Sequence, residues 1–321
     1  MSAANSSGSQ PNDTTGHADM IFVSVYSIIS VVGFVLNVMA LVVFFRHAKS
    51  RSHTTVYMTN LAIADLVLIL SLPMRIYHHL GFPDLPQRLC DWAGLILLAN
   101  MYGSIILLTC ICFDRCMAVT FPMSHRVREG RKKAPLVCVG VWILTFSTSV
   151  PIYLFKSQKD YKERHCFGGL PIYIVQPVAF FPTLSIGFGI PLTVMLICSW
   201  GLLRAIRQST VAQTELVDSK KIQRMIAASL LIFLLSFLPY HTVLILLYHN
   251  GVAPVSPALL ASYQYSLMVA CLNAMLDPIV YYFTTSTFRE KVDMEAMRKM
   301  VQLNSHSSME ANSKNKAPIN T

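Results

Sequence analysis

Long apolar runs, separated by short polar segments, dominate the chain between residues 20 and 283. A helix rises about 1.5 Å per residue, so about 20 apolar residues are enough to cross the hydrocarbon core of a bilayer. Seven runs reach that length, and they cover residues 20–45, 55–78, 90–119, 135–155, 174–204, 222–249 and 258–283. The pattern therefore predicts an all-α membrane protein, with a seven-transmembrane helix bundle over residues 20–283.

We expect the third run, residues 90–119, to be the one around which the other six are arranged. It begins at Cys90 and stays apolar until its last turn, where Asp114 and Arg115 are neighbours. A charged pair at the edge of the hydrocarbon is costly, and proteins keep such groups where they use them. This pair is therefore a candidate functional element.

Outside the bundle, the sequence predicts a tail at each end and one further helix. Residues 1–19 are polar, which indicates a disordered extracellular tail and no cleavable signal peptide. In residues 284–302 an apolar residue recurs every four positions among basic ones, at Phe288, Val292, Ala296 and Met300. This spacing predicts a short amphipathic eighth helix on the inner membrane surface, followed by a disordered cytoplasmic tail over residues 303–321.

The extracellular tail contains two acceptor triplets for N-glycosylation. Asn5 begins Asn-Ser-Ser and Asn12 begins Asn-Asp-Thr. Such triplets are modified where they are exposed on the lumenal side, as this tail is expected to be. We therefore predict that at least one of the two asparagines is glycosylated.

Composition agrees with the span pattern and limits the classes of function. The chain is 54% hydrophobic and only 13% charged, with a mean hydropathy of +0.50, whereas soluble domains are about 25% charged. A net charge of +10 in a soluble protein suggests nucleic-acid binding. Here the basic residues are clustered on one side of the predicted membrane, so we expect attraction to membrane lipids and no nucleic-acid partner.

The charge distribution predicts the orientation. The loops assigned to the inner side hold 20 of the 26 Lys and Arg and eight acids, which is a net charge of +12. The outer side holds six acids and six basic residues, Arg75, Arg88, Lys156, Lys159, Lys162 and Arg164. Basic residues favour the cytoplasmic side. We therefore expect a multi-pass plasma-membrane protein with an extracellular N-terminus and a cytoplasmic C-terminus.

Two of the eight cysteines are separated from the others by the predicted topology. Cys90 and Cys166 are on the outer, oxidising side, whereas the remaining six lie within spans or at their inner ends. One outer pair permits one disulfide, so we predict a Cys90–Cys166 bond. The six others are expected to be small buried hydrophobic residues.

Two charged residues lie inside the second run. Asp65 is a lone acid near the centre of the bilayer, where a functional role is the default interpretation. Arg75 follows Pro73, which kinks the helix near its outer third. If Arg75 faces inwards it forms an anion site; the alternative is an arginine that extends along the lipid face to the headgroups.

Ordered motifs, one set per span, resemble those of the rhodopsin-class (class A) G-protein-coupled receptors over about residues 20–300. They are Gly33–Asn37, Leu61–Asp65, Cys90, Asp114-Arg115-Cys116, Trp142, Pro191, Phe237-Leu-Pro239 and Asp277-Pro278-Ile-Val-Tyr281. The sequence departs from the family pattern at Cys116 (usually Tyr), Phe237 (usually Trp) and Asp277 (usually Asn). These departures look like the branch of purinergic, protease-activated and lysophospholipid receptors, closest to lysophosphatidic acid receptors and neighbouring orphan receptors.

The resemblance implies an ion cluster and a switch within the bundle. Asp65, Ser104, Asn273 and Asp277 are expected to hold water and an allosteric sodium ion, with no other cofactor; two adjacent acids in hydrocarbon need a cation or a proton in any case. The implied switch residues are Asp114, Arg115, Phe233, Phe237, Pro239 and Tyr281. In the resting state Asp114 is expected to hold Arg115, and the hinge at Pro239 is expected to release it.

For the ligand we predict an extracellular anion, a lysophospholipid or similar lipid mediator, with its acidic head on Arg75. The residues expected to line the site with it are Tyr102, Tyr240, His241 and Tyr263. Helix packing for Tyr102 and a core position for His241 are alternatives. Nucleotide receptors of this branch place a basic residue three positions after the histidine, where this chain has Leu244. A nucleotide or small carboxylic acid is therefore the alternative ligand class.

The resemblance also implies a heterotrimeric G protein and arrestin as partners. A transporter or channel is the main alternative from another class, but it favours inverted repeats or several broken helices, which the sequence does not show. An intramembrane enzyme needs a catalytic signature such as His-Glu-x-x-His, and none is present. Residues 258–283 contain no lysine for a retinal Schiff base, and residues 1–19 contain no arginine at which a tethered ligand is cleaved free.

Overall fold

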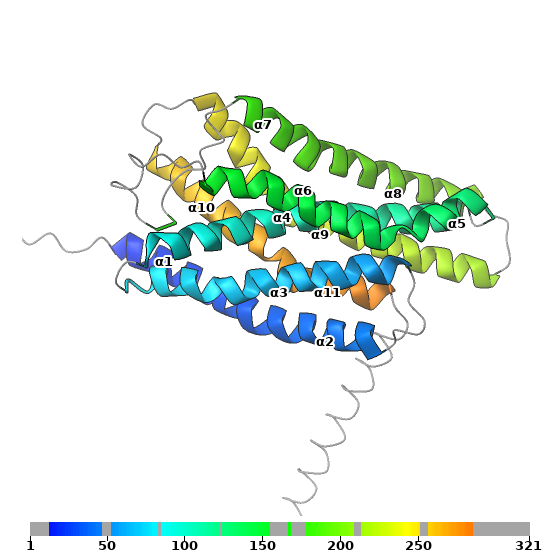
Figure 1. The fold of residues 1–321 in the computed structure, drawn as a ribbon, viewed down its shortest axis with the longest axis horizontal. Coiled ribbons are helices and arrows are strands. Elements are labelled where there is room, and N and C mark those ends of the chain that lie inside the picture. Colours follow the sequence, from blue (N-terminus) through cyan, green and yellow to red (C-terminus); the bar gives the residue numbers. More distant parts are fainter. Residues whose placement is uncertain are drawn as a thin grey trace, which may run out of the picture.

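The computed structural model describes residues 13–46, 53–82, 85–121, 123–154, 166–167, 177–208, 213–250 and 256–284. For residues 13–18, 151–154, 205–208, 213–221 and 281–284 this description covers the backbone alone. All regular secondary structure within these ranges is helical, and the helices run roughly side by side along the long axis of the molecule (Figure 1). The predicted eighth helix and both tails lie outside the described residues, apart from the start of α1.

Each predicted span has a helical counterpart, with bounds that differ by a few residues. The first half comprises α1 (Asp13–Ile28), a π-helical turn (Ile29–Gly33), α2 (Phe34–Arg46), α3 (His53–His79), α4 (Gln87–Thr120), α5 (His125–Arg131) and α6 (Ala134–Leu154). The second half comprises α7 (Pro177–Leu184), a π-helical turn (Ser185–Gly189), α8 (Ile190–Gln208), α9 (Gln213–Asn250), α10 (Pro257–Cys271) and α11 (Asn273–Thr284). Within the described residues, six helical stretches are long and apolar enough to cross a membrane, and the bent pair of α5 and α6 gives a seventh when it is counted as one span.

Several spans are less regular than the sequence predicts, and one segment differs in its structure. The first and fifth spans are each interrupted by a π-helical turn, and the seventh is split at Leu272 into α10 and α11. The segment 205–221, expected to be a loop, is largely helical because α8 continues to Gln208 and α9 begins at Gln213. Hydropathy marks where a helix meets the lipid boundary, but it does not report helices that continue into water or change their winding.

Pro278 lies inside α11, six residues after the break at Leu272. Pro278 has no N–H, so the carbonyl oxygen of Ala274, four residues earlier, loses its usual helical donor. The side-chain amide of Asn37 fills this place, because its Nδ2 donates to the Ala274 oxygen at 2.7 Å and to the Gly33 oxygen at 2.9 Å. The two irregular helices are therefore joined through a single buried amide.

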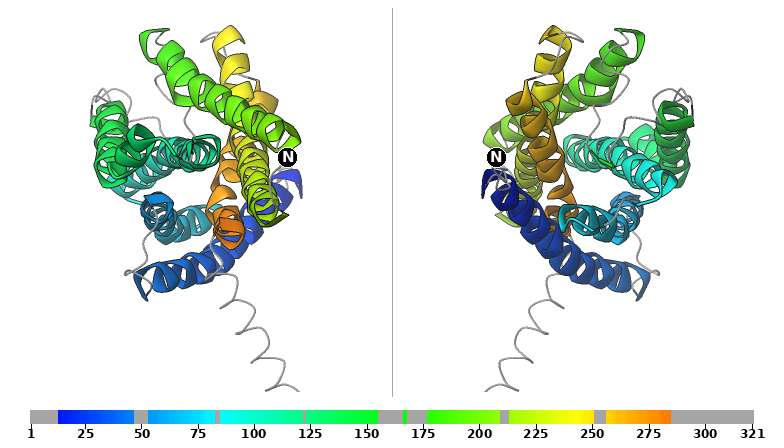
Figure 2. Two further views of the ribbon diagram at one scale, coloured as in Figure 1. Left: turned by 90° about the vertical axis from the view of Figure 1, so that its right-hand side faces the viewer. Right: turned by 90° about the vertical axis from the view of Figure 1, so that its left-hand side faces the viewer.

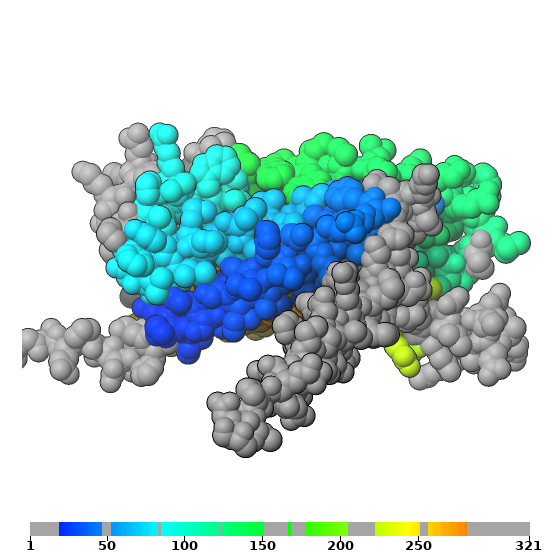
Figure 3. Space-filling view, turned by 90° about the horizontal axis from the view of Figure 1, so that it is seen from below, coloured from blue at the N-terminus to red at the C-terminus, as the bar shows by residue number. Residues whose placement is uncertain are grey.

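The bundle is centred on α4, as the sequence predicted. This helix contacts α3, α6, α8, α9 and α10, and 72% of its most apolar window is buried, against 33% for the first span. The end-on views show the other helices gathered around it (Figure 2). The outward faces remain apolar, with Leu70 and Leu136 both more than 60% exposed, which suits contact with lipid rather than water. Figure 3 shows one such face, crossed by α1 and α2.

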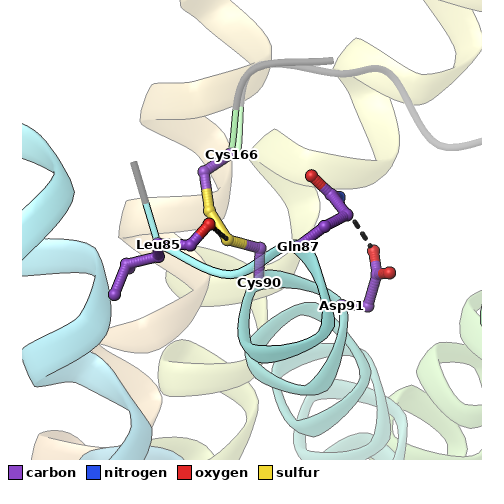
Figure 4. The surroundings of a disulfide bond; sticks show 5 residues. All are labelled: Leu85, Gln87, Cys90, Asp91 and Cys166. Carbon is purple, nitrogen blue, oxygen red and sulfur yellow. Dashed lines mark hydrogen bonds between the residues drawn. A yellow bond between two sulfur atoms is a disulfide. The ribbon is translucent and has the colours of Figure 1, made fainter. Parts of the chain in front are cut away.

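The predicted disulfide is present. Cys90, in the first turn of α4, is bonded to Cys166, and their Cα atoms are 5.7 Å apart. Figure 4 shows the bond joining the start of α4 to the short described segment of residues 166–167. Because α4 is the central helix, the bond holds this segment over the end of the bundle. In Figure 1 that end lies opposite to α5.

Candidate functional site

Arg75 lies inside the bundle at the end that carries the disulfide. Its side chain is only 6% exposed, so the alternative in which it lies along the lipid face is wrong. Its guanidinium carbon is 4.4 Å from the ring centroid of Phe167, next to Cys166, and the guanidinium lies close enough to the hydroxyl of Tyr26 to interact with it. Its Nε is buried and has no hydrogen-bond partner among the described residues. A buried donor in this state is costly, and an anion relieves that cost.

The sequence analysis missed the contribution of α1 to this end of the bundle. Tyr26 contacts Arg75, and the ring of Phe22 stacks on His79 at 4.4 Å and on Tyr265 at 4.8 Å. His79 Nδ1 is 2.8 Å from a carboxylate oxygen of Asp19. Asp19, Phe22 and Tyr26 lie within two turns of one another in α1. Their spacing in the sequence indicates that they share one side of the helix. The hydropathy pattern alone gave no reason to pair them with α3.

A second group of predicted ligand residues surrounds His241 in α9. The imidazole is 1% exposed, stacks on Phe188 at 4.1 Å and meets Tyr102 edge-on at 6.0 Å. Its Nδ1 is 2.8 Å from the carbonyl oxygen of Phe237, whereas its Nε2 is buried with no hydrogen-bond partner among the described residues. One ring nitrogen thus remains for a ligand, in an aromatic setting.

The π-helical turn before α8 makes room for this group. A Cβ on Gly187 would lie 2.8 Å from Cε1 of Tyr102, so only a glycine lets the tyrosine ring approach here. Tyr240 is fully buried and Tyr263 is 6% exposed, with ring centroids 6.1 Å apart. The predicted aromatic residues therefore come together from α4, α9 and α10.

The four predicted ion-cluster residues are fully buried, each at 0% exposure: Asp65, Ser104, Asn273 and Asp277. Asn100 Nδ2 donates to Asp65 Oδ1 at 3.2 Å, and Asn273 Nδ2 donates to Asp277 Oδ2 at 3.3 Å. The two carboxyl groups are close enough to repel each other when both are ionised. The structure therefore brings α3, α4 and α11 together around a pair of acids.

This cluster fits a hard cation. One oxygen of each member, namely Asp65 Oδ2, Ser104 Oγ, Asn273 Oδ1 and Asp277 Oδ1, is buried without a hydrogen-bond partner among the described residues. Carboxylate, hydroxyl and amide oxygens are the donors that hard cations prefer. The donor set thus agrees with the sodium ion that the motifs implied.

The predicted hinge residues lie in α9, within about two turns before His241. Phe233 and Phe237 are fully buried, with ring centroids 5.6 Å apart, and Phe233 stacks on Phe188 at 5.4 Å. Pro239 lies inside α9, two residues beyond Phe237. Phe188 therefore contacts both His241 and the hinge residue Phe233.

At the opposite end, the predicted contact between Asp114 and Arg115 is not formed. The carboxylate of Asp114 instead pairs with Arg131 of α5, whose Nε is 2.7 Å from Oδ1, and it accepts a hydrogen bond from Thr54. Neighbouring residues on a helix point about 100° apart, so one carboxylate does not easily serve the adjacent side chain. The pair expected for the resting state is therefore absent from this structure, and its role in that state stays a prediction.

Several predicted residues lie outside the described part. They include Asn5 and Asn12, the loop cations Lys156, Lys159, Lys162 and Arg164, and the eighth helix. The backbone of α11 includes Tyr281, but its side chain belongs to this group as well. Their roles remain predictions.

Comparison with known proteins adds an independent finding. A family model described as 7 transmembrane receptor (rhodopsin family) matches residues 36–281. Lysophosphatidic acid receptor 4 of Homo sapiens is 32% identical over 313 residues, which are 93% of this chain and 81% of that receptor. Lysophosphatidic acid receptor 6 of Gallus gallus is 35% identical over 283 residues, 83% of this chain and 90% of that receptor.

A relative whose name gives a different ligand matches the chain with similar identity and coverage. Cysteinyl leukotriene receptor 1 of Homo sapiens is 33% identical over 287 residues, 85% of this chain and 84% of that receptor. The family match and these relatives confirm the resemblance drawn from the ordered motifs, including its branch. The chain therefore belongs to the rhodopsin family of seven-transmembrane, G-protein-coupled receptors, which are multi-pass plasma-membrane proteins and not enzymes.

Proposed function

We propose that this receptor binds an anionic lipid mediator of the lysophospholipid type at the end of the bundle that carries the disulfide, and that this end is extracellular. The single observation that carries the proposal is Arg75, a buried arginine whose Nε lacks a partner among the described residues. Relatives named as lysophosphatidic acid and cysteinyl leukotriene receptors support a lipid with an acidic group.

The chemistry of the site favours one anionic head over several. Arg75 supplies one buried guanidinium, and the Tyr26 hydroxyl beside it supplies a further donor. The remaining predicted ligand residues present aromatic rings, and Nε2 of His241 has no hydrogen-bond partner among the described residues. A triphosphate needs several charge-assisted partners, whereas a lipid needs one such partner and an apolar surface for its chain. A nucleotide is therefore not favoured.

The contacts suggest how binding reaches the inner face. A ligand that touches His241 also acts on Phe188, which stacks on both His241 and Phe233. Phe233 and Phe237 precede the Pro239 hinge, so a shift of these rings changes the angle of the inner half of α9. The ligand moves this equilibrium only to the extent that it binds one state more tightly.

The buried acids act on the same equilibrium from the middle of the bundle. Asp65 in α3 and Asp277 in α11 are held together only while their charge is balanced. A bound sodium ion supplies that balancing charge when present. At the inner end, Arg115 is proposed to engage the G protein, and arrestin is proposed to compete for the same face. The tail and the loop cations are proposed to lie outside the cell.

The test is a ligand screen with a matched pair of arginine variants. Cells expressing the receptor are exposed to lysophosphatidic acid, lysophosphatidylinositol, a cysteinyl leukotriene, ATP and small carboxylic acids, and G-protein activation is measured. Arg75→Ala is expected to raise the half-maximal concentration of the active lipid about 10- to 100-fold, since a charged hydrogen bond is worth about 1.5–3 kcal/mol.

Arg88→Ala is the control, because Arg88 is an exposed cation at the start of α4 on the same side. Its dose response is expected to match the wild type when both variants reach the cell surface equally. An unchanged dose response in Arg75→Ala would remove Arg75 from the site. Activation by ATP, but not by any lipid, would overturn the proposed ligand class.

A further inference from the structure

Two cysteines from different helices meet at the inner end of the bundle. Cys116 lies near the end of α4, and its Sγ is 3.7 Å from the backbone carbonyl oxygen of Cys198 in α8. The two thiol groups are also close enough to interact with each other. The residues are 82 positions apart in the sequence, so it is the packing of α4 against α8 that brings them together.

The two thiols differ in their access to water. The sequence predicted that Cys116 is buried, but its side chain is only partly buried, and its Sγ lies 3.8 Å from the hydroxyl oxygen of the exposed Thr120. Cys198, by contrast, is 5% exposed. A small reagent in the water at the inner face therefore reaches Cys116 first and finds a second thiol beside it.

A third cysteine lies nearby but is a poorer partner. Cys112 is fully buried one turn earlier in α4, where its thiol is close enough to the hydroxyl of Ser229 in α9 to interact with it. Residues four apart on a helix have Cβ atoms about 5–6 Å apart, whereas a disulfide needs about 3.5–4.5 Å. Oxidation of Cys116 is therefore expected to join it to Cys198 and not to Cys112.

The pair lies beside the residue proposed to engage the G protein. Cys116 follows Arg115 directly, and the Nε of Arg115 is buried with no hydrogen-bond partner among the described residues. The helix that carries Cys198 also packs against α9, which contains the Pro239 hinge. A covalent bond between α4 and α8 would therefore restrain the inner end of the bundle, where the hinge is proposed to act.

We propose that Cys116 and Cys198 are a modification site, at which a peroxide forms a reversible disulfide that ties α4 to α8 and lowers G-protein activation. The bond fixes one arrangement of the inner end, whereas activation needs the inner end to change between two. The proposal rests on the G-protein coupling of the family and not on the ligand.

The chemistry balances with hydrogen peroxide as the oxidant. The thiolate of Cys116 attacks one peroxide oxygen, the O–O bond breaks, and a sulfenic acid forms while the leaving hydroxide takes up the thiol proton as water. The thiol of Cys198 then attacks the oxidised sulfur, the S–S bond forms and a second water leaves. The two thiols together lose two electrons, which the peroxide gains. Two molecules of glutathione reverse the reaction and are themselves oxidised to their disulfide.

The first test detects the bond itself. Membranes that contain the full-length receptor are treated with hydrogen peroxide, the remaining thiols are blocked, and the receptor is digested without reduction. Mass spectrometry is expected to find the peptide of Cys116 joined to that of Cys198, and glutathione is expected to separate them. Absence of the joined pair would overturn the proposal, and so would a Cys112–Cys116 bond in its place.

The second test measures the effect on signalling. Peroxide is removed, heterotrimeric G protein is added, and GTP exchange is divided by the amount of receptor. Treatment is expected to lower exchange by the wild type about fivefold or more, in the usual range of coupling between sites, and glutathione is expected to restore it. In Cys116→Ser and Cys198→Ser, exchange is expected not to change with peroxide. The control is Cys138→Ser, which removes a buried thiol of α6 and is expected to respond like the wild type.

The remaining outcomes separate the proposal from its premise. An equal loss of exchange in the serine variants would show that peroxide acts elsewhere, and unchanged exchange in a wild type that carries the bond would show that the bond does not regulate; either result would overturn the proposal. A wild type that is silent before treatment would overturn the G-protein coupling on which the proposal rests. Thermal unfolding keeps the comparison independent of the G protein, because peroxide is expected to raise the melting temperature of the wild type and of Cys138→Ser alone.

Discussion

The bundle buries carboxylates in two places and treats them in opposite ways. At the inner end, both oxygens of Asp114 accept hydrogen bonds, from Arg131 and Thr54. In the middle, Asp65 and Asp277 each keep one oxygen without a hydrogen-bond partner among the described residues, and neither acid forms an ion pair within those residues. The carboxylate of Asp114 is satisfied by groups of the protein itself. The pair of Asp65 and Asp277 requires a cation or a proton from outside the protein, so its state depends on ion concentration and pH.

This difference separates a mechanical contact from a responsive one. A pair that satisfies itself changes only when an element moves, and here that element is α5. A site that lacks its counter-charge changes with the concentration of the ion, even in a rigid bundle. Substitutions at the two sites therefore have different signatures, and the following predictions are ordered from the largest expected effect to the smallest.

The largest effect is expected from Asp65→Asn in the middle of the bundle. This change keeps the shape but removes one of the two charges that need a cation. Agonist affinity of the wild type is expected to differ about 5- to 150-fold between sodium chloride and choline chloride, which is the usual range of coupling between sites. In the variant the difference is expected to vanish. A sodium response that survives in Asp65→Asn would contradict the role of Asp65 in holding the cation.

A smaller effect is expected from Asn100→Leu, which removes the amide donor to Asp65 Oδ1. The carboxylate then loses a hydrogen bond at 3.2 Å in a fully buried position. We expect a loss of about 1–3 kcal/mol in unfolding free energy, the cost of an unsatisfied buried polar group. Thermal unfolding in detergent measures it, and added sodium is expected to recover part of the loss. Recovery that is equal with potassium would argue against a specific site.

The smallest effect is expected from Thr54→Val at the inner end. It removes one donor from Asp114, but Arg131 still bonds both carboxylate oxygens. We expect a loss of about 0.5–1.5 kcal/mol, typical of one hydrogen bond whose partner stays satisfied, and no dependence on sodium. The same unfolding assay is the measurement. A loss larger than that of Asn100→Leu would reverse the ordering of the two sites.

Most of the architecture could be read from residue pattern. The seven spans, the central place of the third and the Cys90–Cys166 bond all agree with the structure. Each depends on a rule that acts locally: an apolar run long enough to cross a bilayer, or two cysteines left alone on an oxidising side. The burial of Asp65 follows likewise, because a charge near the bilayer centre must face the interior. For Arg75, near the outer end of its span, the sequence left a lipid-facing position open, and the structure decided the burial.

The sequence by itself therefore determined that the chain crosses a membrane, in which segments, and which polar residues the bundle must accommodate. Only the tertiary structure decided the partners: Arg131 and not Arg115 for Asp114, Tyr26 for Arg75, and Asn37 for the carbonyl released by Pro278. The physical reason is that burial depends on a residue's own chemistry and its neighbours along the chain. A hydrogen bond between residues on different helices depends on their relative rotation and depth, which packing of the whole bundle sets.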